Sequence, residues 1–377
     1  MTTAGQGLDF SASRSKIRYS NSFNSLSARR MSSIRKVAKD AGVSIATVSR
    51  VINGSGAVTP DMRDRVMASV AKCGYSPTVG RKSHGSIALV YAGPCTIASP
   101  YDSACLAGIV GAMEESPFDL QIVNIRRDKR PDETFAQFFM RRSVEGAIVR
   151  CTAAERRLVS QIHQDGFPVV VLGDHFEAEG LKFVYNDSQA ASQEAVEYLI
   201  SLGHRDIAFA ASDRDDGDHL DRLRSYRETM SQHGLADDRL IYKLPAIQED
   251  GTQLMRKMLG AARRPTAVFI ADPLVALGAI NEAHNLGVRI PDDMSFVGFD
   301  DAELRYAVHP KMTAVCQNSV ELGSRAFQYL VHQTTENPAS VPPELRGEAW
   351  LEIHHSSGPV PAGAASRSET VTSGAGV

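Results

Sequence analysis

The 377-residue chain lacks several features that would assign it to a class at once. Its five cysteines are scattered and no two of them form a CxxC pair, so the sequence predicts neither a zinc ribbon, nor a redox dithiol, nor any other metal site. No apolar run is long enough to span a bilayer. The first thirty residues lack the apolar core of a secretory signal. These absences predict a cytoplasmic protein with reduced thiols.

Signatures of the common α/β enzymes are missing as well. The sequence has no GxGxxG, no Walker loop, no GxSxG and no spaced set of metal ligands. We therefore expect that the chain is not an enzyme and needs no cofactor. An enzyme stays open as a second hypothesis, because doubly wound folds often carry catalysis. A secreted sugar-binding protein is a third hypothesis, and it would need a signal peptide.

Charge is low overall but unevenly distributed. The net charge is −3. Residues 32–82 nevertheless hold nine basic and only three acidic side chains, so the rest of the chain is acidic. A basic N-terminal module on an acidic body indicates a polyanionic partner at one end of the chain.

The composition changes several times along the chain. Both ends are polar and of low complexity, which predicts disorder, and Met31 is an alternative translation start. The expected divisions are a disordered extension (1–31), a helical domain (32–76), a linker (77–85), an α/β body (86–355) and a disordered tail (356–377).

The body alternates short apolar runs with helix-length amphipathic segments. The expected strands are 86–92, 120–125, 146–150, 168–173, 182–187, 207–212, 266–271 and 294–300. The clearest helical segments between them are 189–202, 220–233 and 274–286. Such alternation predicts parallel sheets covered on both faces. This number of strand–helix units exceeds what a single sheet usually holds, so we expect two doubly wound lobes.

Residues 40–53, DAGVSIATVSRVIN, combine a tight turn with a helical pattern. Gly42 adopts positive φ at little cost, so the chain can turn sharply there. The hydroxyl of Ser44 is suited to cap the helix that follows. Pro60 suits the first turn of a third helix. On the second helix we expect Thr47, Val48 and Val51 to face inward and Ile45, Ala46, Ser49 and Arg50 to face outward. This arrangement predicts a helix-turn-helix unit.

The longer stretch around this turn reads IRKVAKDAGVSIATVSRVINGSGAVTPDMRDRVMASVAKCGYSP. It closely resembles the DNA-binding domain of the LacI/GalR family of bacterial transcription regulators. The resemblance implies that the second helix enters the major groove of DNA. The positions that match base-reading residues of the family are Ile45, Ala46 and Arg50. Those that match phosphate-contacting residues are Ser33, Ser44, Thr47, Ser49 and Asn53, although Ser44 can serve as a helix cap alone.

The linker departs from the family pattern. Family members usually continue with a short hinge helix that contains a leucine, and paired hinge helices wedge into the minor groove. Here the text GYSPTVGRKSHGSIALV is shorter, has no leucine before the first strand and carries two glycines, Gly80 and Gly85. A helix is therefore not expected in this linker.

The resemblance continues over residues 86–355, through segments such as EAVEYLISLGHRDIAF and MSFVGFDD. It implies a two-lobed effector domain like that of periplasmic sugar-binding proteins, with a ligand between the lobes and a strand crossover near Asn186. The positions that match ligand-contacting residues are Ser99, Tyr101, Asp187, Arg222, Asp272 and Asp300, with Pro100 in the same loop. Helix capping is the alternative role for each Asp that follows a strand, and surface pairing with Asp218 and Asp221 is the alternative for Arg222. Tyr101 is as well suited to the core.

The resemblance also implies partners. A single helix-turn-helix reads a half-site, so we expect a homodimer on a palindromic DNA operator. The expected effector is a sugar or sugar derivative, with a nucleobase as the alternative. The chain has Asp272-Pro273 where the family has Asn-Asp, so the effector is expected to differ from common hexoses. The predicted function is a transcription regulator, most often a repressor.

Overall fold

The structure, a computed structural model, describes residues 34–52, 58–73, 85–335 and 345–362. The chain divides into two compact units, Met1–Ser83 and His84–Val377. Within the described ranges, no helix is long and apolar enough to cross a membrane. The predicted extension 1–31 and all of the predicted linker except Gly85 lie outside the described residues.

The first unit is helical, as predicted. Its elements are α1 (Ile34–Ala41), α2 (Ile45–Ile52) and α3 (Pro60–Cys73). Gly42 makes the turn between α1 and α2 at a φ of 65°, where a residue with a Cβ would be strained. Ser44 caps α2, because its Oγ accepts a hydrogen bond from the amide of Thr47 at 3.1 Å.

One small core holds the three helices together. Its buried members are Val37, Ala38, Ala41, Val48, Val51 and Val66. The inward face predicted for α2 is confirmed for Val48 and Val51, while Thr47 is half-buried. At the turn, the Arg65 guanidinium donates to the carbonyl oxygen of Ala41 at 2.8 Å, which satisfies an acceptor at the end of α1.

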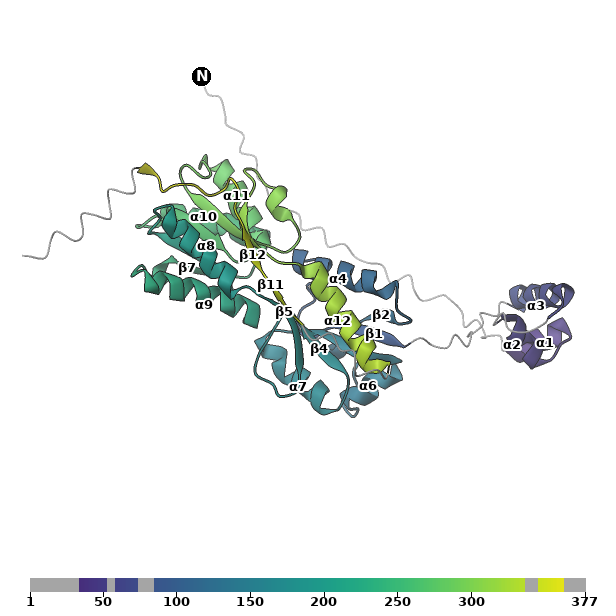
Figure 1. Cartoon of the computed structure of the whole chain (residues 1–377). Helices are drawn as coiled ribbons and strands as arrows, with labels where there is room; N and C mark the ends of the chain where they lie inside the picture. Colours follow the sequence, from purple (N-terminus) through teal and green to yellow (C-terminus); the bar gives the residue numbers. More distant parts are fainter. Residues whose placement is uncertain (1–33, 53–57, 74–84, 336–344, 363–377) are drawn as a thin grey trace, which may run out of the picture. The chain divides into compact units, whose positions relative to one another are not determined.

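The second unit contains two α/β lobes, as predicted (Figure 1). Lobe 1 has the sheet order β11-β5-β4-β3-β1-β2. Its strands are β1 (Ser86–Tyr91), β2 (Asp119–Val123), β3 (Val144–Arg150), β4 (Val169–Leu172), β5 (Lys182–Asp187) and β11 (Arg346–Glu348). Its helices are α4 (Pro100–Met113), α5 (Ile125–Asp128), α6 (Phe135–Arg141), α7 (Arg156–Gln164) and α12 (Ser319–Thr334). Apolar clusters place α6 and α7 on one face of the sheet and α4 and α12 on the other.

Lobe 2 repeats this plan with the sheet order β12-β10-β9-β8-β6-β7. Its strands are β6 (Ile207–Ser212), β7 (Ile241–Leu244), β8 (Ala267–Ile270), β9 (Ser295–Asp300), β10 (Thr313–Cys316) and β12 (Trp350–Glu352). Its helices are α8 (Gln189–Ser201), α9 (Gly217–Gln232), α10 (Gln248–Gly260) and α11 (Pro273–Asn285). The core places α10 and α11 on one face and α8 and α9 on the other. The described strands pair in parallel except β12, which is antiparallel to β10.

The chain crosses between the lobes three times. It leaves lobe 1 after β5, returns after β10 to form α12, and crosses again between β11 and β12. The first crossing confirms the predicted crossover near Asn186. Figure 1 shows β5, β11 and β12 in the middle of this unit, where the lobes meet.

Two sequence predictions fail in this unit. The disordered tail was expected to begin at residue 356, but Ser356 and Ser357 are buried, and Ser356 exchanges backbone and side-chain hydrogen bonds with Phe296 of β9 and Thr313 of β10. The prediction is wrong here because the polarity of this segment is used to pair with the sheet rather than with water. The strands β7, β10, β11 and β12 were also missed, because they have three or four residues each and no long apolar run.

Candidate functional site

The outer face of α2 carries the side chains predicted to read DNA. Ile45, Ala46 and Arg50 are exposed, and Ile45 leaves 45% of its surface in water although it is aliphatic. Ile45 is the first residue of α2 and Arg50 lies in its last turn, and both side chains are exposed. This pair suits contact with a thymine methyl and a guanine edge.

Three of the predicted phosphate-contacting residues, Ser44, Thr47 and Ser49, belong to the described part of the chain. Ser44 and Thr47 hydrogen-bond to each other through their hydroxyls at 2.9 Å, so the cap also fixes the Thr47 side chain. Ser49 is half-buried on the same helix. Ser33 and Asn53 lie outside the described residues.

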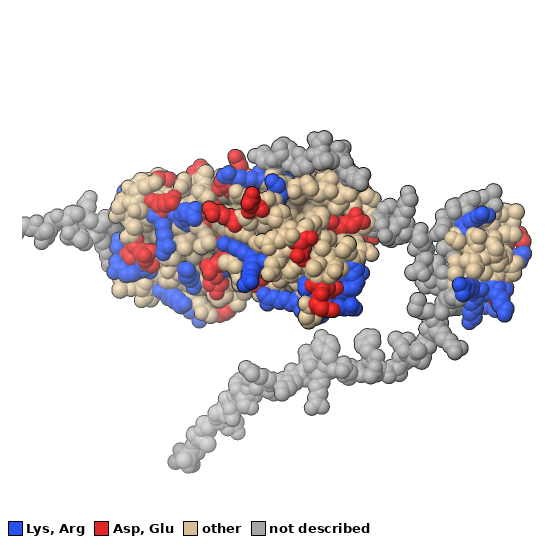
Figure 2. All heavy atoms as spheres, turned by 90° about the horizontal axis from the view of Figure 1, so that it is seen from below, with Lys and Arg blue, Asp and Glu red and all other residues tan. Residues whose placement is uncertain are grey.

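The charge of this unit favours a polyanion. Its exposed basic side chains are Arg35, Lys36, Lys39, Arg50, Arg63, Arg65 and Lys72, against Asp40, Asp61 and Asp64. Asp40 is already paired with Lys72 at 2.8 Å. Figure 2 shows Lys and Arg gathered along one edge of the unit, whereas both signs mix on the visible face of the two-lobed unit. Such a basic face supplies the sequence-independent part of DNA binding.

A cavity of about 300 Å³ lies between the two lobes. Lobe 1 contributes the loop before α4 and the end of β3, and lobe 2 contributes the starts of α9 and α11 and the residue after β9. A neighbouring cavity shares Thr96, Arg150, Arg214 and Asp216 with it. The cavity therefore lies beyond the carboxyl ends of parallel strands, where ligands bind in such sheets.

Lobe 1 presents a rigid wall built on Arg150. Its Nε donates to Asp102 Oδ1 at 2.7 Å, its Nη1 donates to the carbonyl oxygen of Leu172, and its guanidinium lies 4.8 Å from the centre of the Tyr101 ring. The hydroxyl of Tyr101 is buried without a hydrogen-bond partner. Burial raises the pKa of this phenol, so it stays a neutral donor. Ser99 caps α4 by accepting from the Asp102 amide at 3.1 Å, so its hydroxyl has a structural role even though it lines the cavity.

Lobe 2 presents the first turns of α9. Asp216 caps the helix and accepts hydrogen bonds from the backbone and Nδ1 of His219 at 2.9 and 2.7 Å. Although burial opposes it, contact with His219 holds the pKa of Asp216 down to about 2. Asp218 has a buried Oδ1 without a partner, and burial together with repulsion from Asp216 raises its pKa to about 6. The two carboxylates thus differ. Asp216 accepts hydrogen bonds as a helix cap, whereas Asp218 Oδ1 has no hydrogen-bond donor.

Arg222 follows one turn later on the same face of α9. Its guanidinium lies over the Phe299 ring, 3.4 Å from the ring centre, and Nη1 donates to the Ala271 carbonyl oxygen at 2.8 Å. Its Nε is buried with no partner. The arginine is therefore fixed in place with a donor left over, which suits a hydroxyl or carbonyl oxygen of a ligand.

The remaining carboxylates come from α11 and from the end of β9. Asp272 lines the cavity, but its Oδ1 also caps α11 by accepting from the amides of Leu274 and Val275. Burial raises its pKa. Asp301 lines the cavity as well and accepts from Gln317 Nε2, and burial raises its pKa to about 6.

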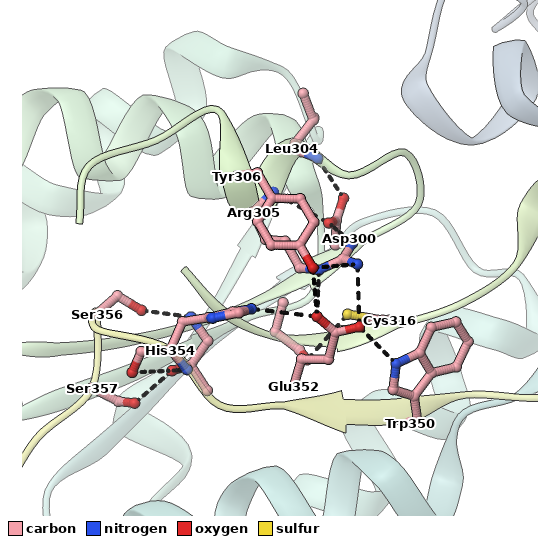
Figure 3. Close-up of polar contacts among 12 residues, drawn as sticks. Asp300, Leu304, Arg305, Tyr306, Cys316, Trp350, Glu352, His354, Ser356 and Ser357 are labelled. Atoms are coloured by element: carbon pink, nitrogen blue, oxygen red, sulfur yellow. Dashed lines mark hydrogen bonds and ion pairs between the residues drawn. The ribbon is translucent and has the colours of Figure 1, made fainter. Parts of the chain in front are cut away.

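Two predicted ligand residues do not line the cavity. Asp300 is buried beneath it, where Oδ1 accepts from the amides of Ala302 and Leu304 and Oδ2 pairs with Arg305 at 2.7 Å (Figure 3). Asp187 accepts from the amide of Gln189 and pairs with Arg346. For both residues the contacts in the structure fit the capping alternative, since their oxygens accept from nearby amides and pair with an arginine.

Arg305 links Asp300 to a second carboxylate. Its Nε donates to Glu352 Oε2 at 2.8 Å, and Glu352 also accepts from Trp350 and Tyr306 (Figure 3). The Trp350 indole, with Arg305 and Tyr306, holds the pKa of Glu352 down to about 2. This network ties β12 to the loop after β9 and explains why Asp300 is structural.

Sequence reasoning missed several polar residues of the cavity, among them Arg150, Asp218 and Asp301. Arg150 ends an expected strand, so the rule that ligands gather at carboxyl ends could have found it. Asp301 stands next to Asp300 in the same GFDD motif, and only the backbone geometry after β9 decides which of the two faces the cavity. Asp218 lies one helical turn before Arg222, on the same side of α9.

Comparison with known proteins gives the family. Residues 33–78 match the model for bacterial regulatory proteins of the lacI family, and residues 196–356 match a periplasmic binding protein-like domain. The first unit therefore contains a DNA-binding domain of the lacI family type, and the second contains a domain of the periplasmic binding protein-like type. The DNA-binding domain, together with relatives that are transcription regulators over most of their length, makes the chain a DNA-binding transcription regulator.

Individual relatives agree over most of the chain. Catabolite control protein A of Priestia megaterium is 26% identical over 79% of this chain and 91% of its own length. The ribose operon repressor of Haemophilus influenzae is 28% identical over 82% of this chain and 93% of its own. The solved complex of the transcriptional regulator CelR with cellobiose is 27% identical, with a TM-score of 0.62 over 86% of this chain and 99% of that one.

Proposed function

We propose that this LacI-family regulator is a repressor that binds a palindromic operator as a homodimer and responds to a sugar or sugar derivative held between its lobes. The observation that carries the DNA part is the face of α2, with Arg50 and Ile45 exposed on a unit rich in basic side chains. One such unit covers a half-site, so two-fold symmetry follows. Because it acts on operator DNA, we expect the protein to work in the cytoplasm.

Unsatisfied polar atoms in the cavity support the class of effector. Tyr101 Oη, Asp218 Oδ1 and Arg222 Nε are all buried without hydrogen-bond partners. This mixture of donors and acceptors suits a ligand with several hydroxyl groups, each of which both donates and accepts. One face of the Tyr101 ring is covered by Arg150, which favours a sugar over a nucleobase that needs a stacking surface. The ribose operon repressor and the CelR–cellobiose complex agree with this class.

The route from effector to DNA follows from the position of the cavity. A ligand changes DNA affinity only through its different affinity for two conformations of the protein. A molecule that contacts Arg150 of lobe 1 and Arg222 of lobe 2 favours the closed arrangement of the lobes. We propose that this change of lobe angle sets the spacing of the two DNA-binding units in the dimer.

The experiment that tests the function is selection of bound duplexes from a random pool by the purified full chain at near-physiological salt. A palindromic enriched motif supports the dimeric regulator, and its central spacing reports how far apart the two units act. Binding that depends on salt but not on sequence would contradict it. The effector arm is a thermal-shift panel that includes D-ribose, cellobiose and adenine, in which stabilisation by adenine alone would overturn the sugar assignment.

A further inference from the structure

Two loops from opposite lobes meet beside the cavity. From lobe 1 comes the turn after β4, Gly173 to His175, and from lobe 2 comes the first turn of α9. The cavity residues Asp218 and Arg222 lie on that same helix. Whatever holds these two loops together therefore also sets the position of two ligand-facing side chains.

His175 makes the main side-chain contact across this junction. Its Nε2 lies 2.9 Å from Asp221 Oδ2 and 3.9 Å from Asp218 Oδ1. Its ring is held from behind by Tyr185 of β5, with the ring centres 4.4 Å apart. The imidazole is thus fixed by lobe 1 and aimed at two carboxylates of lobe 2.

A backbone contact at the same junction shows how closely the lobes approach. The amide of Gly217 donates to Asp174 Oδ1 at 2.6 Å, and Asp174 is fully buried and paired with Arg156. A Cβ on Gly217 would lie 2.6 Å from the carbonyl oxygen of His175. Only glycine fits here, and because the first amides of a helix have no partner within it, this amide is protected by the other lobe alone.

We propose that His175 is a positioning residue, which holds the first turns of α9 against lobe 1 so that Asp218 and Arg222 face the effector. It acts through Asp221 and Asp218 rather than by touching the ligand, since it does not line the cavity. The proposal rests on the proposed function only in taking the inter-lobe cavity as the effector site.

The charges around His175 give the junction a pH dependence. Asp218 and Asp221 face it from α9, Asp174 adjoins it on its own loop, Arg156 neutralises Asp174, and Arg224 lies 3.6 Å from Asp221. The hydrogen bond to Asp221 raises the pKa of His175. Because the contact with Asp221 raises the pKa of His175, this contact is strongest below the ordinary pKa of histidine. It weakens as the pH rises through the raised value.

Hydrogen exchange at the Gly217 amide, measured on the full chain without ligand or DNA, tests the proposal. In His175→Ala we expect this amide to exchange about tenfold faster at pH 6, since a hydrogen bond to a charged group is lost. His175→Gln should restore part of the protection, because an amide can still donate to Asp221, but without the pH profile of the wild type. The matched control is His233→Gln, which removes a histidine that pairs with Glu197 inside lobe 2 at 2.9 Å, and it should leave exchange at Gly217 unchanged.

Equal exchange in the wild type and in His175→Ala would overturn the proposal, and so would an identical pH profile in His175→Gln. If His175→Ala does not fold, the comparison of wild type with His175→Gln still decides. Neither result depends on operator selection, so a failure here leaves the proposed function standing, and failure to select an operator leaves this measurement intact.

Discussion

The Nδ2 atom of Asn186 donates a hydrogen bond to Oε1 of Gln317 at 3.3 Å, and this contact joins two of the three segments that cross between the lobes. Gln317 in turn donates to Asp301, which lines the cavity. The third crossing segment is close as well, since a Cβ on Gly347 would meet Oδ1 of Asn186. The side-chain amide of Gln317 therefore connects a crossing strand to a carboxylate that lines the cavity, so we expect a change of lobe angle to move Asp301.

Arg50→Ala tests the DNA-reading face. A bidentate arginine–guanine contact is worth about 1–3 kcal/mol of discrimination between bases, so we expect a loss of about ten- to a hundredfold in preference for the selected operator over a scrambled duplex. Competition binding on the two duplexes measures this preference. Arg63→Ala, which removes an exposed charge on α3, should weaken both duplexes alike. Unchanged preference in Arg50→Ala would show that another residue reads the operator.

Asp300 and Asp301 are neighbours in the chain, but only Asp301 lines the cavity, whereas Asp300 pairs with Arg305. Asp301→Asn should remove the response to the sugar found by the thermal-shift panel, with little change in the unfolding temperature, because its side chain faces the cavity. Asp300→Ala should instead destabilise the protein by about 3 kcal/mol, since it leaves the buried Arg305 with Glu352 alone. Thermal unfolding and ligand titration on both variants check this. A full response in a stable Asp301→Asn would contradict the assignment of the cavity.

The sequence predicted the elements that carry a long periodic signal. Every expected strand of the body is present within two residues of its bounds, and the turn at Gly42 and the cap at Ser44 are confirmed. Those features depend on local propensity and on apolar runs, which one sequence displays directly. Short edge strands such as β11 and β12 depend on pairing partners far away in the chain, and so they were missed.

The predicted site residues also differ in how far local sequence determines where their side chains point. Arg222 and Asp272 were placed at the cavity because a helix face and a strand end fix their direction. Asp300 and Asp187 do not line the cavity, because a residue that follows a strand can turn either toward the cavity or back onto nearby amides. That choice depends on Arg305 and Arg346, whose approach no local pattern indicates.

Each lobe contains a pair of helices that pack through glycines, which gives a sharp stability test. In lobe 1 a Cβ on Gly323 of α12 would lie 1.9 Å from the Cys105 carbonyl oxygen, and in lobe 2 a Cβ on Gly278 of α11 would lie 1.9 Å from that of Gln248. We expect Gly323→Ala to lower the free energy of unfolding by at least about 2 kcal/mol, because backbone must move. The matched control is Gly111→Ala in α4, where nothing lies within 4 Å, and it should stabilise by about 0.5–1 kcal/mol. Denaturant unfolding compares the two, and equal effects would rule out the close helix packing.

His204 anchors the segment after residue 355, which was expected to be disordered. Its Nδ1 lies 2.9 Å from Thr266 Oγ1, and its Nε2 lies 3.1 Å from Ser295 Oγ and 3.0 Å from the carbonyl oxygen of Gly358. A neutral ring that accepts at Nδ1 and donates at Nε2 satisfies these partners, and burial lowers the pKa of His204.

The sign of the pH effect follows from that lowered pKa. Below about pH 6.5 the unfolded chain takes up a proton at this histidine and the folded chain does not, so the free energy of unfolding falls as the pH decreases, by up to about 1.4 kcal/mol per pH unit. His204→Gln should flatten the curve between pH 7 and 5.5, measured on a His175→Gln background because the raised pKa of His175 acts in the opposite direction. Truncation after residue 355 should abolish the effect of His204→Gln together with the anchored segment, whereas truncation after residue 362 should preserve it. An unchanged pH dependence in His204→Gln would mean that the ring titrates freely and does not hold Gly358 in place.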